Sequence, residues 1–128
     1  MGADEMDALI RAMYEQAQKV RAVLRAAPEK PASTLAPGEW YADIIGWPVL
    51  VTRATRNRVQ GVRPLKGDAE LDALEIQTHP VRVVDEAYAR MVVENAAAWH
   101  IYLITSGFED FRRRCLQAYT GTIDEPRP

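Results

Sequence analysis

The segment 52–66, TRATRNRVQGVRPLK, holds the densest group of side chains that could do chemistry. It has no acidic residue and carries five basic ones: Arg53, Arg56, Arg58, Arg63 and Lys66. Arginine donates paired hydrogen bonds to phosphate oxygens, and affinity for nucleic acid grows with the number of phosphates that a protein neutralises. The segment therefore predicts a phosphate-binding site for a nucleotide or a nucleic acid.

Three observations favour a less specific role for this basic segment. Acidic residues follow it and can pair with its charges: Asp68, Glu70, Asp72 and Glu75. It contains no aromatic side chain on which bases stack. The whole chain has a formal net charge of -2, unlike the basic domains that bind nucleic acid. A solvated or internally paired surface, a phosphate ligand and an acidic protein partner all stay open.

Residues suited to catalysis are sparse in this chain. Its two histidines are His79, which precedes a proline, and His100, which lies in an apolar segment where a core position is expected. Neither stands at a zinc-ligand spacing from another histidine, and no phosphate-cradling loop or nucleophile motif occurs. We therefore expect no enzyme, no metal and no cofactor. An acid–base pair of His100 and Glu94 is the catalytic alternative.

Cys115 is the single cysteine, so the chain forms no internal disulfide. We expect this side chain to be a small buried hydrophobe. The neighbouring basic run, residues 112–114, follows Glu109 and Asp110 at helical spacing, which predicts that these carboxylates neutralise it.

A long amphipathic helix is predicted over residues 4–26, because its apolar side chains recur at three- and four-residue spacing. Acidic residues crowd its start and basic residues its end, as the helix dipole favours. A proline-rich linker, residues 28–37, follows. The apolar stripe either folds back on the body of the protein or pairs with a second copy as a short coiled-coil seam.

The candidate interface combines this stripe with the aromatic residues that follow the linker, because Trp and Tyr are frequent at interface hot spots. The same aromatic side chains also suit a core. The interface consists of Met6, Leu9, Ile10, Met13, Val20, Leu24, Trp40, Tyr41 and Trp47.

The body, residues 38–121, begins with a predicted antiparallel sheet. Strands are expected at 49–55, 59–63 and 81–84, with a turn around Asn57. Gly61 indicates a bulge or a close backbone approach. The segment 73–78 fits a helix or a strand equally well.

Two helices are expected to complete the body. The first follows the N-cap Asp85 and runs to about Thr105; it is apolar nearly all round, which indicates a buried core element. The second covers 108–119 and is capped by Gly121, and residues 122–128 form a polar tail. The fold class is therefore α+β, with residues 1–27 as a separate helix.

The composition predicts a soluble cytoplasmic protein, because no apolar run is long enough to span a bilayer and the acidic start is no secretory signal. Thirteen arginines against three lysines indicate a bacterium or a phage. Our leading hypothesis is a small non-catalytic protein–protein interaction module, homodimeric, with an accessory or inhibitory role toward a protein partner. The alternative is a phosphate binder that uses residues 53–66.

Overall fold

The computed structural model describes residues 2–120, and the side chains of residues 2–118. The predicted cap at Gly121 and the tail 122–128 lie outside the described residues, as does the side chain of Tyr119. The chain divides into two compact units: residues up to Lys19 together with those from Asn95 onward, and residues 20–94. Within residues 2–120, no helix has both the length and the apolar character of a membrane span.

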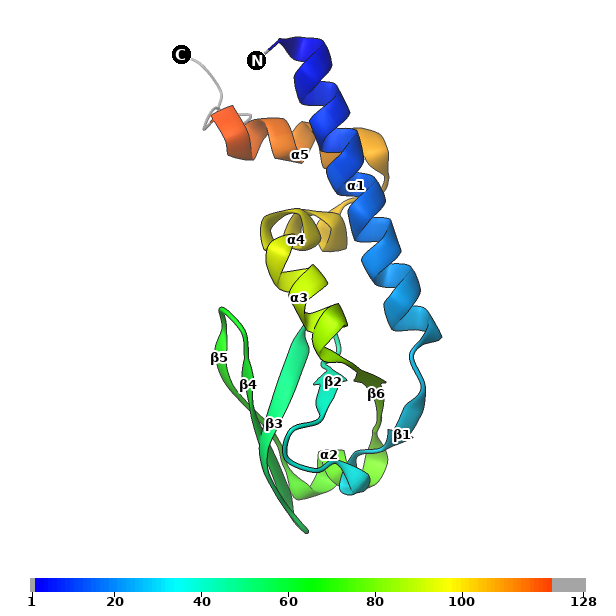
Figure 1. Cartoon of the computed structure of the whole chain (residues 1–128), viewed down its shortest axis with the longest axis vertical. Coiled ribbons are helices and arrows are strands. Elements are labelled where there is room, and N and C mark those ends of the chain that lie inside the picture. The colour runs from blue at the N-terminus through cyan, green and yellow to red at the C-terminus, as the bar shows by residue number, and fades with distance from the viewer. Residues whose placement is uncertain (1, 121–128) are drawn as a thin grey trace. The chain divides into compact units, whose positions relative to one another are not determined.

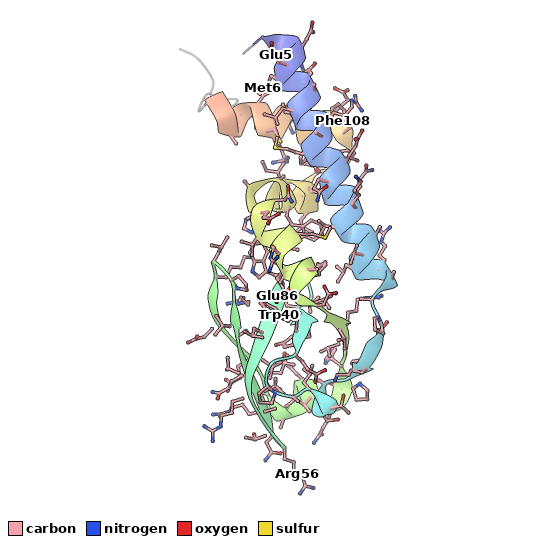
Figure 2. All side chains as sticks on the ribbon, viewed as in Figure 1. Glu5, Met6, Trp40, Arg56, Glu86 and Phe108 are labelled. Carbon is pink, nitrogen blue, oxygen red and sulfur yellow. The ribbon has the colours of Figure 1, made fainter. Side chains whose placement is uncertain are left out.

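The first unit is helical and contains the start of α1 (Ala3–Ala26), α4 (Ala96–Ile104) and α5 (Phe108–Thr120). Its core consists of the buried residues Ile10, Ala98, Phe111 and Cys115. Figure 2 labels Met6 and Phe108, which pack against this core from α1 and α5. The apolar stripe at the start of α1 thus folds back on the C-terminal helices of its own chain.

The helix expected from Asp85 to Thr105 is two helices, α3 (Glu86–Glu94) and α4, interrupted at Asn95. Asp85 caps α3 as predicted, because its Oδ1 accepts a hydrogen bond from the Tyr88 amide at 2.8 Å. The two helices belong to different units. α3 buries Tyr88, Ala89 and Val92, and α4 buries Ala98 and Trp99, so apolar residues run through both helices.

The second unit is built on a six-stranded antiparallel sheet with the order β1-β6-β2-β3-β4-β5 (Figure 1). Three strands match the prediction and confirm the α+β class. The strands are β1 (Glu29–Pro31), β2 (Trp40–Ala42), β3 (Pro48–Thr55), β4 (Arg58–Arg63), β5 (Gly67–Leu71) and β6 (Pro80–Val84).

The segment 28–37 is not the structureless linker that its prolines suggested. It contains β1, in which Lys30 pairs with Val81 of β6, and the 3-10 turn η1 (Ala32–Thr34). The Lys30 ammonium also lies 2.8 Å from a carboxylate oxygen of Glu39, which fastens the segment to the residues before β2. Pro31 is tolerated because β1 is an edge strand, where a missing amide donor breaks no ladder.

Gly61 lies where two strands approach closely, as its position in a strand predicted. A Cβ atom built there would lie 2.5 Å from the Leu50 carbonyl oxygen and 2.7 Å from a Val49 side-chain carbon. The register of β3 against β4 also shifts between Val51 and Arg53, directly beside this glycine. The bulge and the close approach are therefore one feature of the β3–β4 hairpin.

The ambiguous segment 73–78 is the helix α2 (Ala73–Thr78). A capping box explains the choice, because Asp72 accepts from the Glu75 amide at 2.8 Å and Glu75 accepts from the Asp72 amide at 3.2 Å. Figure 1 shows α2 beside η1 at one end of the sheet. Both pack on one sheet face, over a core of Ala32, Leu35, Tyr41, Val49, Val51, Val59, Ile76 and Val81.

Candidate functional site

The five basic residues predicted as a phosphate site do not form one cluster. Arg56 lies at the free end of the β3–β4 hairpin (Figure 2), whereas Arg63 ends β4, about 17 Å farther along the strand. Arg58 forms an ion pair with Glu70 at 2.8 Å, and the Lys66 ammonium lies 4.5 Å from the centroid of the Trp47 ring. The extended strand β4 therefore separates Arg56 and Arg58 from Arg63 and Lys66.

The candidate interface also needs correction, because most of its side chains serve the chain's own cores. Ile10, Val20 and Trp47 are fully buried, so they are not available to a partner. Leu9 is 44% exposed. The other members are buried or half-buried: Met6, Met13, Leu24, Trp40 and Tyr41.

The sheet unit contains a groove of about 730 Å³, and each of the six strands contributes at least one residue to its lining. Its exposed or half-buried apolar lining residues include Ile44, Leu71 and Pro80. Six strands span about 24 Å across a sheet, which is the length of about seven residues of extended chain. The residues that line the groove therefore come from across the whole width of the sheet.

Tyr41 and Arg63 lie on either side of Val49 within the groove. Tyr41 pairs directly with Val49, and the register that joins Leu50 to Val62 places Arg63 opposite Val49 on the other side. Residues directly opposite one another share a sheet face. Two polar side chains on one face therefore flank an apolar one, about 10 Å apart at their Cα atoms.

Tyr41 is 3% exposed, and burial together with the nearby carboxylates of Asp43 and Glu75 raises its pKa to about 12. The Arg63 guanidinium opposes part of this shift in pKa. The hydroxyl therefore keeps its proton at neutral pH and can donate a hydrogen bond. Among residues 2–120 this hydroxyl makes no hydrogen bond, and Tyr41 lines the groove, so the hydroxyl is a free donor toward a ligand or water.

Arg63 is the second groove residue with an unused donor. Its Nη2 donates to the Asp68 carbonyl oxygen at 3.0 Å, which holds the side chain in place. Its Nε is buried and has no partner within the described part of the chain. Nor does any carboxylate of residues 2–118 form an ion pair with this guanidinium, although it is half-buried.

Negative charge predominates around the groove, since its lining includes five carboxylates and two guanidinium groups. The carboxylates belong to Glu29, Asp43, Asp68, Glu70 and Glu75, and the guanidinium groups belong to Arg63 and Arg82. Glu29 lies 3.6 Å from Arg82, and Glu70 pairs with Arg58. The other three carboxylates form no ion pair with described residues.

Arg82 is committed to the chain's own architecture. Its Nη1 lies within hydrogen-bond distance of three carbonyl oxygens at the end of α1, those of Leu24, Arg25 and Ala27, at 3.4, 3.0 and 3.3 Å. A guanidinium at a helix C-terminus satisfies carbonyl groups that have no partner in the helix. Arg63 is therefore the groove cation that forms no ion pair with the described residues.

One wall of the groove is the loop 43–47, which hydrogen bonds hold rigidly. Asp43 Oδ1 accepts from the amides of Ile45 and Trp47, at 3.0 and 2.9 Å. The Tyr88 hydroxyl donates to the Gly46 carbonyl oxygen at 2.5 Å. Asp43 is thereby fixed through one oxygen, which leaves its other oxygen for a ligand.

The two histidines differ in their relation to the groove. His79 is exposed, as predicted, and lines the groove, where its Nδ1 lies 2.8 Å from the Thr78 hydroxyl. His100 is exposed rather than buried in a core, and neither it nor Glu94 lines the groove. Across residues 2–120, no three His, Cys, Asp or Glu side chains converge as a metal site.

Cys115 is buried as predicted, and burial raises the pKa of its thiol. In the basic run, Asp110 pairs with Arg113 and Arg114 as expected. Arg112 instead pairs with Asp7 of α1 at 2.8 Å. This contact joins the two ends of the sequence within the helical unit.

Sequence reasoning missed the roles of Asp43 and Glu75. Asp43 directly follows β2 and stands two residues after Tyr41, so the strand alternation continued by one residue was the available signal. Glu75 was assigned to neutralising the basic segment, although in the structure it caps α2 and lines the groove. Comparison of the chain with protein-family models, with curated proteins and with solved structures finds no match.

Proposed function

We propose that the protein is a small non-catalytic protein-interaction module whose groove binds an extended, positively charged segment of a partner protein. The observation that carries the proposal is the lining of the groove, in which apolar side chains lie beneath an excess of carboxylates. Lysine and arginine match such a surface, because their aliphatic stems cover apolar atoms while their charged ends reach the rim.

Three carboxylates that form no ion pair explain why the groove should prefer a cationic segment. Asp43, Asp68 and Glu75 line the groove without an ion pair among the described residues, so a cationic segment meets charges that are not already neutralised. An anionic segment would meet the same charges as repulsion, and like charges brought together suppress wrong partners.

The test is an NMR titration of the labelled protein at low salt with hexalysine, and separately with hexaglutamate. We expect hexalysine to shift backbone amides around the groove, such as those of Ala69 and Val81. The double variant Asp43→Asn, Glu75→Gln should weaken this binding at least about tenfold, because truncating a charge pair that is held in a groove is costly. Asn and Gln keep the oxygen acceptors that the loop and the capping box use.

A matched control removes two carboxylates elsewhere: Glu5→Gln with Glu15→Gln, both exposed on α1. This variant should bind hexalysine like the wild type. Equal binding by the groove variant and the wild type would overturn the proposal. Shifts caused by hexaglutamate around Arg53 and Arg56 would instead favour the anion-binding alternative.

Self-association stays a separate prediction, and native mass spectrometry of the same samples tests it. Because the start of the α1 stripe is packed within its own chain, a dimer would have to use other surfaces. An accessory or inhibitory role toward a larger assembly likewise stays a prediction, which identification of the partner protein would test.

A further inference from the structure

The groove contains a cation as well as carboxylates, and this cation narrows the class of ligand. Arg63 is half-buried, has no carboxylate counter-ion among residues 2–118, and keeps a buried Nε without a partner. A guanidinium in this state calls for an anion, since charged groups away from water are stable mainly when they are paired and hydrogen-bonded. A purely cationic ligand would leave the Arg63 guanidinium without an anionic partner.

Tyr41 adds a second donor on the same face of the sheet. Its hydroxyl has no hydrogen-bond partner among the described residues, although the side chain is 3% exposed. Tyr41 and Arg63 flank Val49. Both side chains line the groove, so a ligand with two acceptor oxygens can receive one hydrogen bond from the Tyr41 hydroxyl and one from the Arg63 guanidinium.

A segment rich in lysine or arginine and free of acidic side chains has one anionic group, its terminal carboxylate. We propose that the groove recognises the carboxy-terminal end of a basic protein segment, with the terminal carboxylate held by Tyr41 and Arg63. The last basic side chains then lie against Asp43 and Glu75. This inference rests on the proposed function and names the chemistry of its ligand.

The test compares two probes that differ at one end: acetyl-hexalysine with a free carboxylate, and acetyl-hexalysine carboxamide. Both are titrated into the native protein by calorimetry at low salt. We expect the free acid to bind at least about tenfold more tightly, because hydrogen bonds to a charged acceptor are strong ones. General attraction to the acidic groove acts in the opposite direction, since the carboxamide carries one more net positive charge.

The variant Tyr41→Phe assigns the preference to the site. It removes one donor and keeps the ring, so the ratio of the two affinities should fall about threefold or more, because the hydrogen bond to the charged carboxylate is stronger than the bond to the neutral carboxamide. Arg63→Gln should abolish the preference, and its circular dichroism spectrum checks that the sheet is intact. If that variant unfolds, the proposal is still tested by Tyr41→Phe and by the affinities of the native protein for the free acid and the carboxamide.

The outcomes separate the two proposals. Equal affinity of the native protein for both probes would overturn carboxy-terminal recognition while leaving a groove that binds basic segments. A preference for the free acid that Tyr41→Phe does not change would also overturn it. If neither probe binds, both proposals fall.

Discussion

The indole nitrogen of Trp47 donates a hydrogen bond to the carbonyl oxygen of Pro64 at 2.8 Å, across seventeen residues of sequence. This bond joins the loop before β3 to the turn between β4 and β5. The turn contains Leu65, which has a positive φ of 67° that a non-glycine residue rarely adopts. Trp47 thus connects the loop that contains Asp43 to the turn that follows the groove residue Arg63.

Replacing Trp47 by Phe should destabilise the sheet unit, because the Pro64 carbonyl loses its partner and the smaller ring leaves a void. We expect the free energy of unfolding to fall by about 2–3 kcal/mol, measured by urea denaturation. Trp40→Phe is the matched control, since Trp40 is half-buried and its indole makes no hydrogen bond with described residues. A loss of the same size in both variants would contradict the role given to the Trp47–Pro64 bond.

Replacing Gly61 by Ala should also be destabilising, by about 1–3 kcal/mol. The new Cβ would lie 2.5 Å from the Leu50 carbonyl oxygen, and a paired backbone atom in a central strand cannot move aside. Thermal unfolding followed by circular dichroism measures the effect. Gln60→Ala in the same strand is the control, with an expected change below about 1 kcal/mol. A Gly61→Ala protein as stable as the wild type would show that the hairpin is looser than described.

Tyr41 should make stability depend on pH in the alkaline range. Its pKa is about 12 in the folded state and about 10 in the unfolded chain. Below pH 10 both states hold the proton, and the stabilising contribution is complete. As the pH rises toward 12, the unfolded state releases its proton first, so the free energy of unfolding falls.

The measurement is urea denaturation at a series of pH values from 8 to 12, with Tyr41→Phe as the reference. The variant should lose less stability than the wild type above about pH 10, because it lacks this proton. At pH 7 it should be about as stable as the wild type, within about 0.5 kcal/mol, since the hydroxyl has no partner to lose. Parallel pH profiles would mean that Tyr41 titrates as an exposed phenol.

Local pattern was sufficient for much of the fold. The periodicity of α1, the β-branched run of β3 and the return strand after Asn57 each depend on residues close in sequence, and each element lies where it was predicted. Gly61 likewise predicted the close approach of two strands, because a glycine inside a strand pattern can be recognised from the sequence alone. The assignment of an α+β class followed from these elements.

Other features required contacts between distant residues. β1 exists because β6 pairs with it, and its three residues carry no strand pattern of their own. The long apolar segment after Asp85 divides at Asn95, and its two halves belong to different compact units, which a one-dimensional pattern cannot separate.

The candidate site shows the same division. Sequence alone identified the charged and aromatic side chains, including Arg63 and Tyr41, but grouped them by their distance along the chain. In the sheet these residues have other neighbours. The length of β4 separates Arg56 from Arg63, and antiparallel pairing places Arg63 and Tyr41 on opposite sides of Val49. Strand register is decided by the packing of the whole sheet face, so only the tertiary structure could bring these residues together with Glu75 around one groove.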